Sequence, residues 1–170
     1  MKFYIYLFLI VGLLTGCGYK PSSYYAKAEI EGEVYVDLEI DIDNTQNSIY
    51  VKDAMNEMII NQFNASLTND KENADTYVLV ELGDVSHNSV SSDGAGYTES
   101  YRTTVNIKIK YTKKGKETKT LSVSDYYDYT VDSDSIVTDQ KKKVAIKIAS
   151  RKALSNILSK IAATSMKEKL

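Results

Sequence analysis

The feature that most constrains the fold is a run of fifteen residues, from Tyr97 to Tyr111, in which side chains of two kinds alternate. Successive residues of a strand point to opposite faces of a sheet, so this alternation predicts a half-buried strand. One face carries Tyr101, Thr103, Val105, Ile107, Ile109 and Tyr111, and the other carries Arg102, Asn106, Lys108 and Lys110. At about 3.3 Å per residue the strand would be about 50 Å long, which favours a bulge or a projecting ribbon.

Three further segments have strand patterns. Residues Glu33 to Ile42 alternate strictly, with apolar side chains at the even positions. Thr76 to Leu82 is apolar on both faces, as expected of a central strand, and continues in more polar form towards Ser91. Thr118 to Tyr129 follows a turn at Lys113 to Lys116. These segments and Tyr97 to Tyr111 predict four strands.

Two segments have helical periodicity. The first starts near Asn47 or Ser48 and ends in the polar stretch from Thr68 to Asp75. Its apolar stripe is formed by Val51, Met55, Met58, Ile59, Phe63 and Leu67. The second runs from about Asp139 to Met166. Its inner face is formed by Ile146, Ala149, Ala153, Ile157, Leu158 and Ile161, and much of its remaining surface is lysine-rich.

The predicted order is therefore β-α-β-β-β-α, which places the chain in the α+β class. A right-handed crossover through the first helix can make the first two strands parallel, and the later strands are joined as antiparallel hairpins. We expect a four-stranded, mainly antiparallel sheet with both helices packed on one face. The other face would remain polar and available to a partner.

The N-terminal segment has the pattern of a secretory signal. Lys2 supplies a short positive region, Phe3 to Leu14 is uncharged and apolar, and small residues precede Cys17. The apolar run is short for a membrane span of about 20 residues. Leu14-Thr15-Gly16-Cys17 resembles the lipobox of bacterial lipoproteins. This resemblance implies that Cys17 becomes the mature N-terminus and carries acyl chains, palmitate among them, that anchor the protein to a membrane.

This interpretation divides the chain into a signal peptide (residues 1–16), a lipidated N-terminus and tether (17–31) and a single domain (32–170). The alternative for Cys17 is an incidental cysteine in a secreted protein. Without Lys2 the mature part carries 20 basic and 23 acidic side chains, a net charge of −3. Nucleic-acid binding domains are usually strongly basic, so this balance argues against a nucleic-acid partner.

The sequence offers little for catalysis or for a metal. The single histidine, His87, lies in a polar segment that we interpret as a solvated loop, and the single cysteine is the proposed anchor. Asp132 to Ser135 has oxygen ligands at alternate positions but lacks the glycine and final glutamate of a calcium loop, so we interpret it as a helix-capping loop. Gly94 to Gly96 resembles a hairpin tip rather than a phosphate loop. We expect no enzyme activity, metal or cofactor.

Basic side chains form the main candidate binding site. They cluster along one predicted hairpin and its turn, and they suit phosphate or carboxylate groups. The candidate residues are Arg102, Lys108, Lys110, Lys113, Lys114, Lys116 and Lys119. An equally weighted alternative is a solvated sheet edge that lysines keep soluble. Tyrosines flank this region, either as interface anchors or as ordinary sheet residues.

The lipobox, the start Cys17-Gly18-Tyr19-Lys20 and the order of elements together resemble the LptE family of lipopolysaccharide-assembly lipoproteins. The resemblance implies a lipid-anchored protein on the periplasmic side of the outer membrane, which plugs the lumen of the β-barrel translocon LptD. It also implies binding of lipopolysaccharide or lipooligosaccharide through basic side chains on the sheet and its loops. Pro21 and Ser22 depart from the pattern, since many members continue with a stretch like Leu-Arg-Gly.

A different class remains open. A periplasm-facing lipoprotein that activates a peptidoglycan synthase, or that scaffolds another envelope complex, can share a tether and a small α/β domain. Such an activator needs a long tether to cross the periplasm. Gly18 to Glu31 would extend at most about 50 Å, which favours work close to the bilayer.

Overall fold

The computed structural model describes residues 22–39, 45–92, 98–131 and 138–167, which form helices and strands around one core. The elements are α2 (Ser22–Lys27), β1 (Glu33–Glu39), α3 (Thr45–Met58), the π-helix η2 (Ile59–Phe63), β2 (Ser66–Leu67), β3 (Thr76–Ser92), β4 (Thr98–Lys113), β5 (Lys119–Thr130), α4 (Asp139–Ser155) and α5 (Ile157–Lys167). The interpretations of Cys17, of Gly94 to Gly96 and of Asp132 to Ser135 lie outside the described residues.

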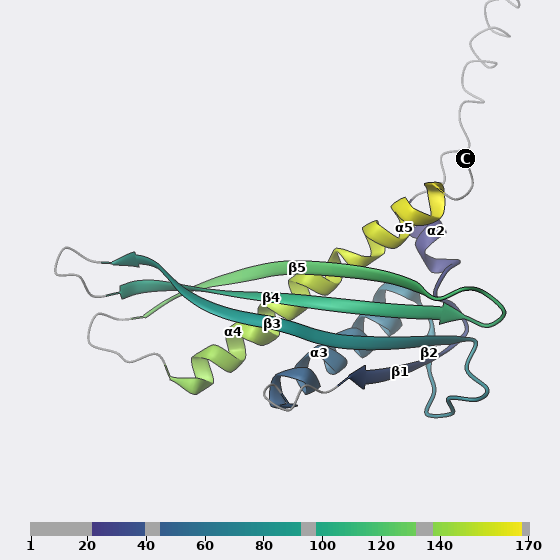
Figure 1. The fold of residues 1–170 in the computed structure, drawn as a ribbon, viewed down its shortest axis with the longest axis horizontal. Helices are drawn as coiled ribbons and strands as arrows, with labels where there is room; N and C mark the ends of the chain where they lie inside the picture. The colour runs from purple at the N-terminus through teal and green to yellow at the C-terminus, as the bar shows by residue number, and fades with distance from the viewer. Residues whose placement is uncertain (1–21, 40–44, 93–97, 132–137, 168–170) are drawn as a thin grey trace, which may run out of the picture.

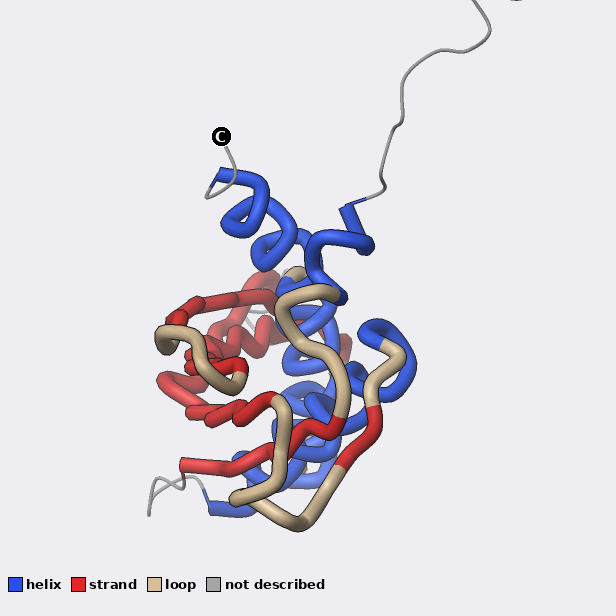
Figure 2. Tube along the Cα trace, turned by 90° about the vertical axis from the view of Figure 1, so that its right-hand side faces the viewer, coloured by secondary structure: helices blue, strands red, loops and turns tan. Residues whose placement is uncertain are grey.

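The five described strands form one sheet in the order β2-β1-β3-β4-β5. β1 pairs in parallel with β2 and β3, whereas β3–β4 and β4–β5 are antiparallel. Figure 2 shows the helices gathered on one side of the strands and at one end of them. The α+β class and the four long strands are confirmed, with β2 as a short fifth strand.

The inner face of the sheet carries the alternating residues that the sequence predicts. Val78 and Val80 on β3 and Val105 and Ile109 on β4 are fully buried. The register between β3 and β4 shifts between Leu82 and Val85, where three steps along β3 oppose two along β4. The hairpin therefore contains a bulge, but its extra residue lies on β3 and not on the strand from Tyr97 to Tyr111 for which we predict one. Beyond the bulge the two strands extend past the start of α4 (Figure 1).

The first helix ends earlier than the sequence predicts. Val51, Met55 and Ile59 are buried as expected, but Leu67 is not on the helical stripe. The chain widens into η2, and Asn64 then adopts a left-handed conformation with φ of 57°. Asparagine tolerates this conformation, which ends a helix because the next residues cannot continue the hydrogen-bonding pattern. Leu67 therefore lies in β2 beside β1 and is 38% exposed.

The final helix is two helices, which corrects the single helix predicted from Asp139 to Met166. The side-chain oxygen of Thr138 accepts a hydrogen bond from the N–H of Lys141 and caps α4. At Asn156 the helix is interrupted, because the N–H of Asn156 donates to the carbonyl oxygen of Ala153, three residues earlier, as in a tighter turn. The predicted inner face is nonetheless buried on both sides of this break. Among the described residues, no helix is long and apolar enough to cross a bilayer.

The segment from residue 22 to residue 31 differs from the irregular tether that we expected. It contains α2, which packs against α5, and both Ala26 and Ile30 are completely buried. A six-residue helix gives too short a periodic pattern to be recognised in sequence. Because Ala26 and Ile30 are buried and α2 packs against α5, the 50 Å reach estimated for an extended chain does not apply to these residues.

Candidate anion-binding site

The seven candidate basic residues fall into two groups along β4 and β5. The outer-face group consists of Arg102, Lys108 and Lys110, which lie on the face of β4 away from the helices. The turn group consists of Lys113, Lys114, Lys116 and Lys119, which lie at the end of β4, in the connecting turn and at the start of β5. The fold therefore brings together the four lysines of the turn but distributes the other three along the sheet.

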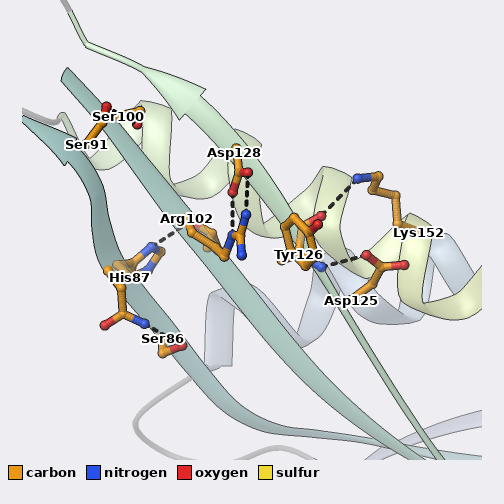
Figure 3. A network of polar contacts seen from close by, with 11 residues as sticks. Ser86, His87, Ser91, Ser100, Arg102, Asp125, Tyr126, Asp128 and Lys152 are labelled. Atoms are coloured by element: carbon orange, nitrogen blue, oxygen red, sulfur yellow. Dashed lines mark hydrogen bonds and ion pairs between the residues drawn. The ribbon is translucent and has the colours of Figure 1, made fainter.

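Each member of the outer-face group has a carboxylate partner. The Arg102 guanidinium donates two hydrogen bonds of 2.7 Å to Asp128 on β5, as Figure 3 shows. These bonds hold the pKa of Asp128 below its usual value. Arg102 also lies over the ring of Tyr126, 3.8 Å from its centre. Lys108 Nζ is 3.4 Å from a carboxylate oxygen of Glu81 on β3.

Lys110 completes this pattern, with its Nζ 4.0 Å from a carboxylate oxygen of Glu39 on β1. The outer-face group is thus matched by acidic groups from three different strands. An incoming phosphate would compete with these carboxylates for the same donors. The outer face consequently has mixed charge, and the basic row seen in the sequence is not a patch of one sign.

The turn group is built around Gly115. Its φ of +75° belongs to the left-handed region that glycine adopts readily, and the N–H of Lys116 bonds to the carbonyl oxygen of Lys113 at 2.8 Å. This geometry fits a tight hairpin turn with glycine at its third position. The turn keeps Lys114 and Lys116 exposed, and within the described part of the chain neither has a carboxylate partner.

The other two lysines of the turn group point towards the N-terminal segment. Lys113 Nζ donates to the carbonyl oxygen of Ala28 at 3.0 Å and forms an ion pair with Glu31. Lys119 Nζ is 3.0 Å from Glu29, whose second carboxylate oxygen accepts a hydrogen bond from Ser165 on α5. These contacts fasten the segment after α2 to β4, β5 and α5.

Two hollows flank Lys113. One has a volume of about 460 Å³ and is lined by Lys116, Lys119, Glu29 and Glu117. The other has a volume of about 510 Å³ and is lined by Lys114 and Glu31 among others. A phosphate group that enters either hollow would meet an exposed lysine and a lysine that already neutralises a glutamate. The chemistry available here is reversible binding of an anion.

Comparison with known proteins places the chain in a family. A family model for LptE, described as lipopolysaccharide-assembly, matches residues 35–161. The chain belongs to the LptE family. The match spans most of the domain and includes all seven candidate basic residues of this LptE-family protein. No curated protein sequence matches it.

Solved structures show the same fold at low sequence identity. Rare lipoprotein B from Shewanella oneidensis superposes with a TM-score of 0.51 and 14% identity, covering 81% of this chain and 99% of that one. Lipoprotein B from Nitrosomonas europaea gives a TM-score of 0.52 and 10% identity, covering 88% and 94%. A putative lipoprotein from Caulobacter crescentus gives 0.51 and 5%, covering 85% and 96%. At such low sequence identities, the structural similarity establishes only the fold of this LptE-family chain.

The acidic partners of the basic residues were missed in the sequence. Glu29 and Glu31 lie in the segment assigned to a tether, and they are 90 and 82 residues from the lysines that they contact. No local pattern could reveal such pairs. Asp128 lies directly opposite Arg102 on β5 in this LptE-family sheet, a pairing that depends on the register of the hairpin.

The histidine is not in a loop, which corrects our interpretation. His87 lies on β3, and its Nδ1 is 2.8 Å from the hydroxyl oxygen of Thr103 on β4. Partial burial of the ring, together with the charge of Lys142 on α4, lowers the pKa of His87. Among the described residues, no group of three or more potential metal ligands lies together in this LptE-family protein.

Proposed function

We propose that this protein is a lipid-anchored, outer-membrane subunit of a lipopolysaccharide-assembly complex. Its acyl chains are carried by Cys17, its partner is an LptD-type β-barrel, and it acts as a plug and a lipopolysaccharide-binding subunit without enzyme activity. The observation that carries this proposal is the match of the LptE model over residues 35–161. The lipobox and the lipoproteins of similar fold support the anchor.

The turn group is the best-supported part of the proposed lipopolysaccharide site. Lys114 and Lys116 are exposed, and neither has a carboxylate partner among the described residues. They can therefore bind the phosphate groups of lipid A without first breaking an ion pair. Lys113 and Lys119 are held next to them by Glu31 and Glu29. Arg102, Lys108 and Lys110 have a smaller role in this proposal, since each would first leave its carboxylate.

The partner is tested by a pull-down of the tagged, lipidated protein from envelope extract in mild detergent. We expect a large outer-membrane β-barrel to remain bound in stoichiometric amount after a high-salt wash. Recovery of a penicillin-binding protein without a barrel would reject the proposal and favour the activation of a peptidoglycan synthase.

The binding site is tested by charge reversal at Lys114 and Lys116, measured as the affinity for purified lipopolysaccharide. We expect weaker binding with an unchanged thermal unfolding midpoint, because both side chains are exposed. Reversal at Lys108 and Lys110 is the matched comparison, and we expect a smaller loss there. Equal affinity of the Lys114 and Lys116 variant and the wild type would refute this assignment.

The anchor is tested separately with Cys17→Ser. The variant should lose membrane fractionation and the incorporation of radiolabelled lipid, since a thioether-linked diacylglyceryl group needs the cysteine sulfur. Unchanged behaviour in both assays would show that Cys17 does not carry the anchor.

A further inference from the structure

A row of polar side chains at the junction of α4 and α5 lies along the outer edge of β5. β5 is the last strand of the sheet, so the N–H and C=O groups of every second residue face away from β4. An unpaired edge of this kind is a template for pairing with a strand of another molecule. Here the helices supply hydrogen-bonding groups to that edge.

Three hydrogen bonds occupy backbone groups in the middle of the edge, and a fourth holds the carboxylate that makes one of them. Lys152 Nζ donates to the carbonyl oxygen of Tyr126 at 3.0 Å, and Lys160 Nζ donates to that of Ser122 at 2.6 Å. Asn156 donates at 3.2 Å to the carboxylate of Asp125, which itself accepts the N–H of Tyr126 at 2.7 Å. Figure 3 shows Lys152 reaching from α4 to Tyr126.

The spacing of the helix residues along the chain explains how their side chains can contact successive groups of β5. Lys152, Asn156 and Lys160 are four residues apart, which places them on one side of the helical path. Ser122 and Tyr126 are also four apart, so their carbonyl groups share the alternation of the strand and point the same way. Figure 1 shows α4 crossing behind the sheet and α5 emerging beyond β5, with the helix junction near this edge.

The strand itself has few features that would prevent pairing. Between Thr120 and Tyr126 its only charged residue is Asp125, and it contains no proline. Two copies of β5 paired in antiparallel about Ser124 would place Ser122 opposite Tyr126 and Val123 opposite Asp125. Such a pairing brings no like charges together, so the strand's own side chains do not oppose it.

We propose that Lys152, Asn156 and Lys160 close the edge of β5 against pairing with β5 of a second copy of this chain. The edge is thereby a latent self-association surface. This inference concerns residues outside the proposed lipopolysaccharide site and does not depend on that function.

The test is sedimentation velocity of the full mature protein in mild detergent over a range of concentrations. We expect Lys152→Ala combined with Lys160→Ala to raise the association constant for dimers by about tenfold or more, because two donors are lost from the edge. A cysteine introduced by Ser124→Cys in this background should form a cross-link between two copies at residue 124, mapped by mass spectrometry.

Two further variants keep the test specific. Lys143→Ala with Lys147→Ala removes the same number of positive charges, both from α4, without removing either lysine donor to the edge of β5, and should stay monomeric. Lys152→Arg with Lys160→Arg keeps donors at the edge and should also stay monomeric. The proposal would be overturned if the Lys152→Ala, Lys160→Ala variant stayed monomeric with a wild-type circular dichroism spectrum. A dimer without the cross-link at residue 124 would also overturn it, as would equal dimerisation of the Lys143→Ala, Lys147→Ala variant.

Discussion

The two ends of the sheet are held together in different ways. At the turn end, where β4 meets β5, α2 packs against α5, and Ile30, Tyr111 and Ile161 are buried. At the distal end, residues 86–92 of β3 are exposed, and their described polar contacts run mainly to the neighbouring strand, such as Ser91 to Ser100 at 2.7 Å.

The difference shows how the two ends of one long hairpin can differ in local stability. The turn end depends on contacts between segments that are more than 80 residues apart, so it forms only when the whole domain is folded. The distal end depends on strand pairing and little buried apolar surface, so it should open locally at lower free energy. The following predictions test this comparison, either between the two ends or within one of them, beginning with the largest effect.

The largest difference is expected for truncation of apolar side chains. Ile30→Ala should lower the free energy of unfolding by about 2–5 kcal/mol, because the side chain is fully buried and its removal leaves a cavity. Val90→Ala at the distal end removes a side chain that is 50% exposed and should cost under about 0.5 kcal/mol. Urea unfolding measures both changes, and equal costs would contradict the comparison.

A second difference separates two glycines with the same backbone conformation. Gly32 and Gly115 have φ of +74° and +75°, so alanine at either position costs about 1–2 kcal/mol. A Cβ at Gly32 would also lie 2.2 Å from a carboxylate oxygen of Asp75, which accepts the N–H of Glu33. Gly115 has open space around it. Gly32→Ala should therefore be more destabilising by about 1 kcal/mol, measured by urea unfolding.

Ion pairs give a smaller contrast. The side chains of Glu29 and Lys119 are only 20% and 23% exposed, and a double-mutant cycle with alanine should give a coupling of about 1 kcal/mol. Arg102 and Asp128 are 38% and 42% exposed, and water screens them more. Their coupling should be the smaller of the two and should decrease further in high salt. A larger coupling at the distal pair would reverse this ranking.

The smallest effect concerns the pH dependence of the distal end. The pKa of His87 is lowered in the folded state, so folding favours the neutral ring. The resulting stability is present above the unfolded pKa of about 6.5 and is lost as the pH falls through the folded pKa. The protein should be less stable at pH 5 than at pH 7, and His87→Gln should reduce this loss. An NMR titration of this single histidine gives the pKa directly, and a value above 6.5 would contradict the prediction.

Strand register limited what the sequence could reveal about the candidate site. The alternation in β4 correctly places Arg102, Lys108 and Lys110 on one face, opposite the buried Val105 and Ile109. The acidic partner of each of these three basic residues depends on the register between neighbouring strands. A local alternation pattern does not distinguish one register from another that is shifted by one residue. A shift of one residue would put Arg102 opposite Tyr127 instead of Asp128, on the other face of β5.

The sequence by itself determined the four long strands, most of the inner face of each helix and the glycine turn that displays Lys114 and Lys116. Each of these follows from periodicity or backbone freedom within a few neighbouring residues. Only the tertiary structure decided that residues 22–31 join the core, that Glu29 and Glu31 neutralise lysines of the turn, and that the α4–α5 junction covers the edge of β5. Those contacts join segments far apart in the chain, and their formation depends on the packing of the whole domain.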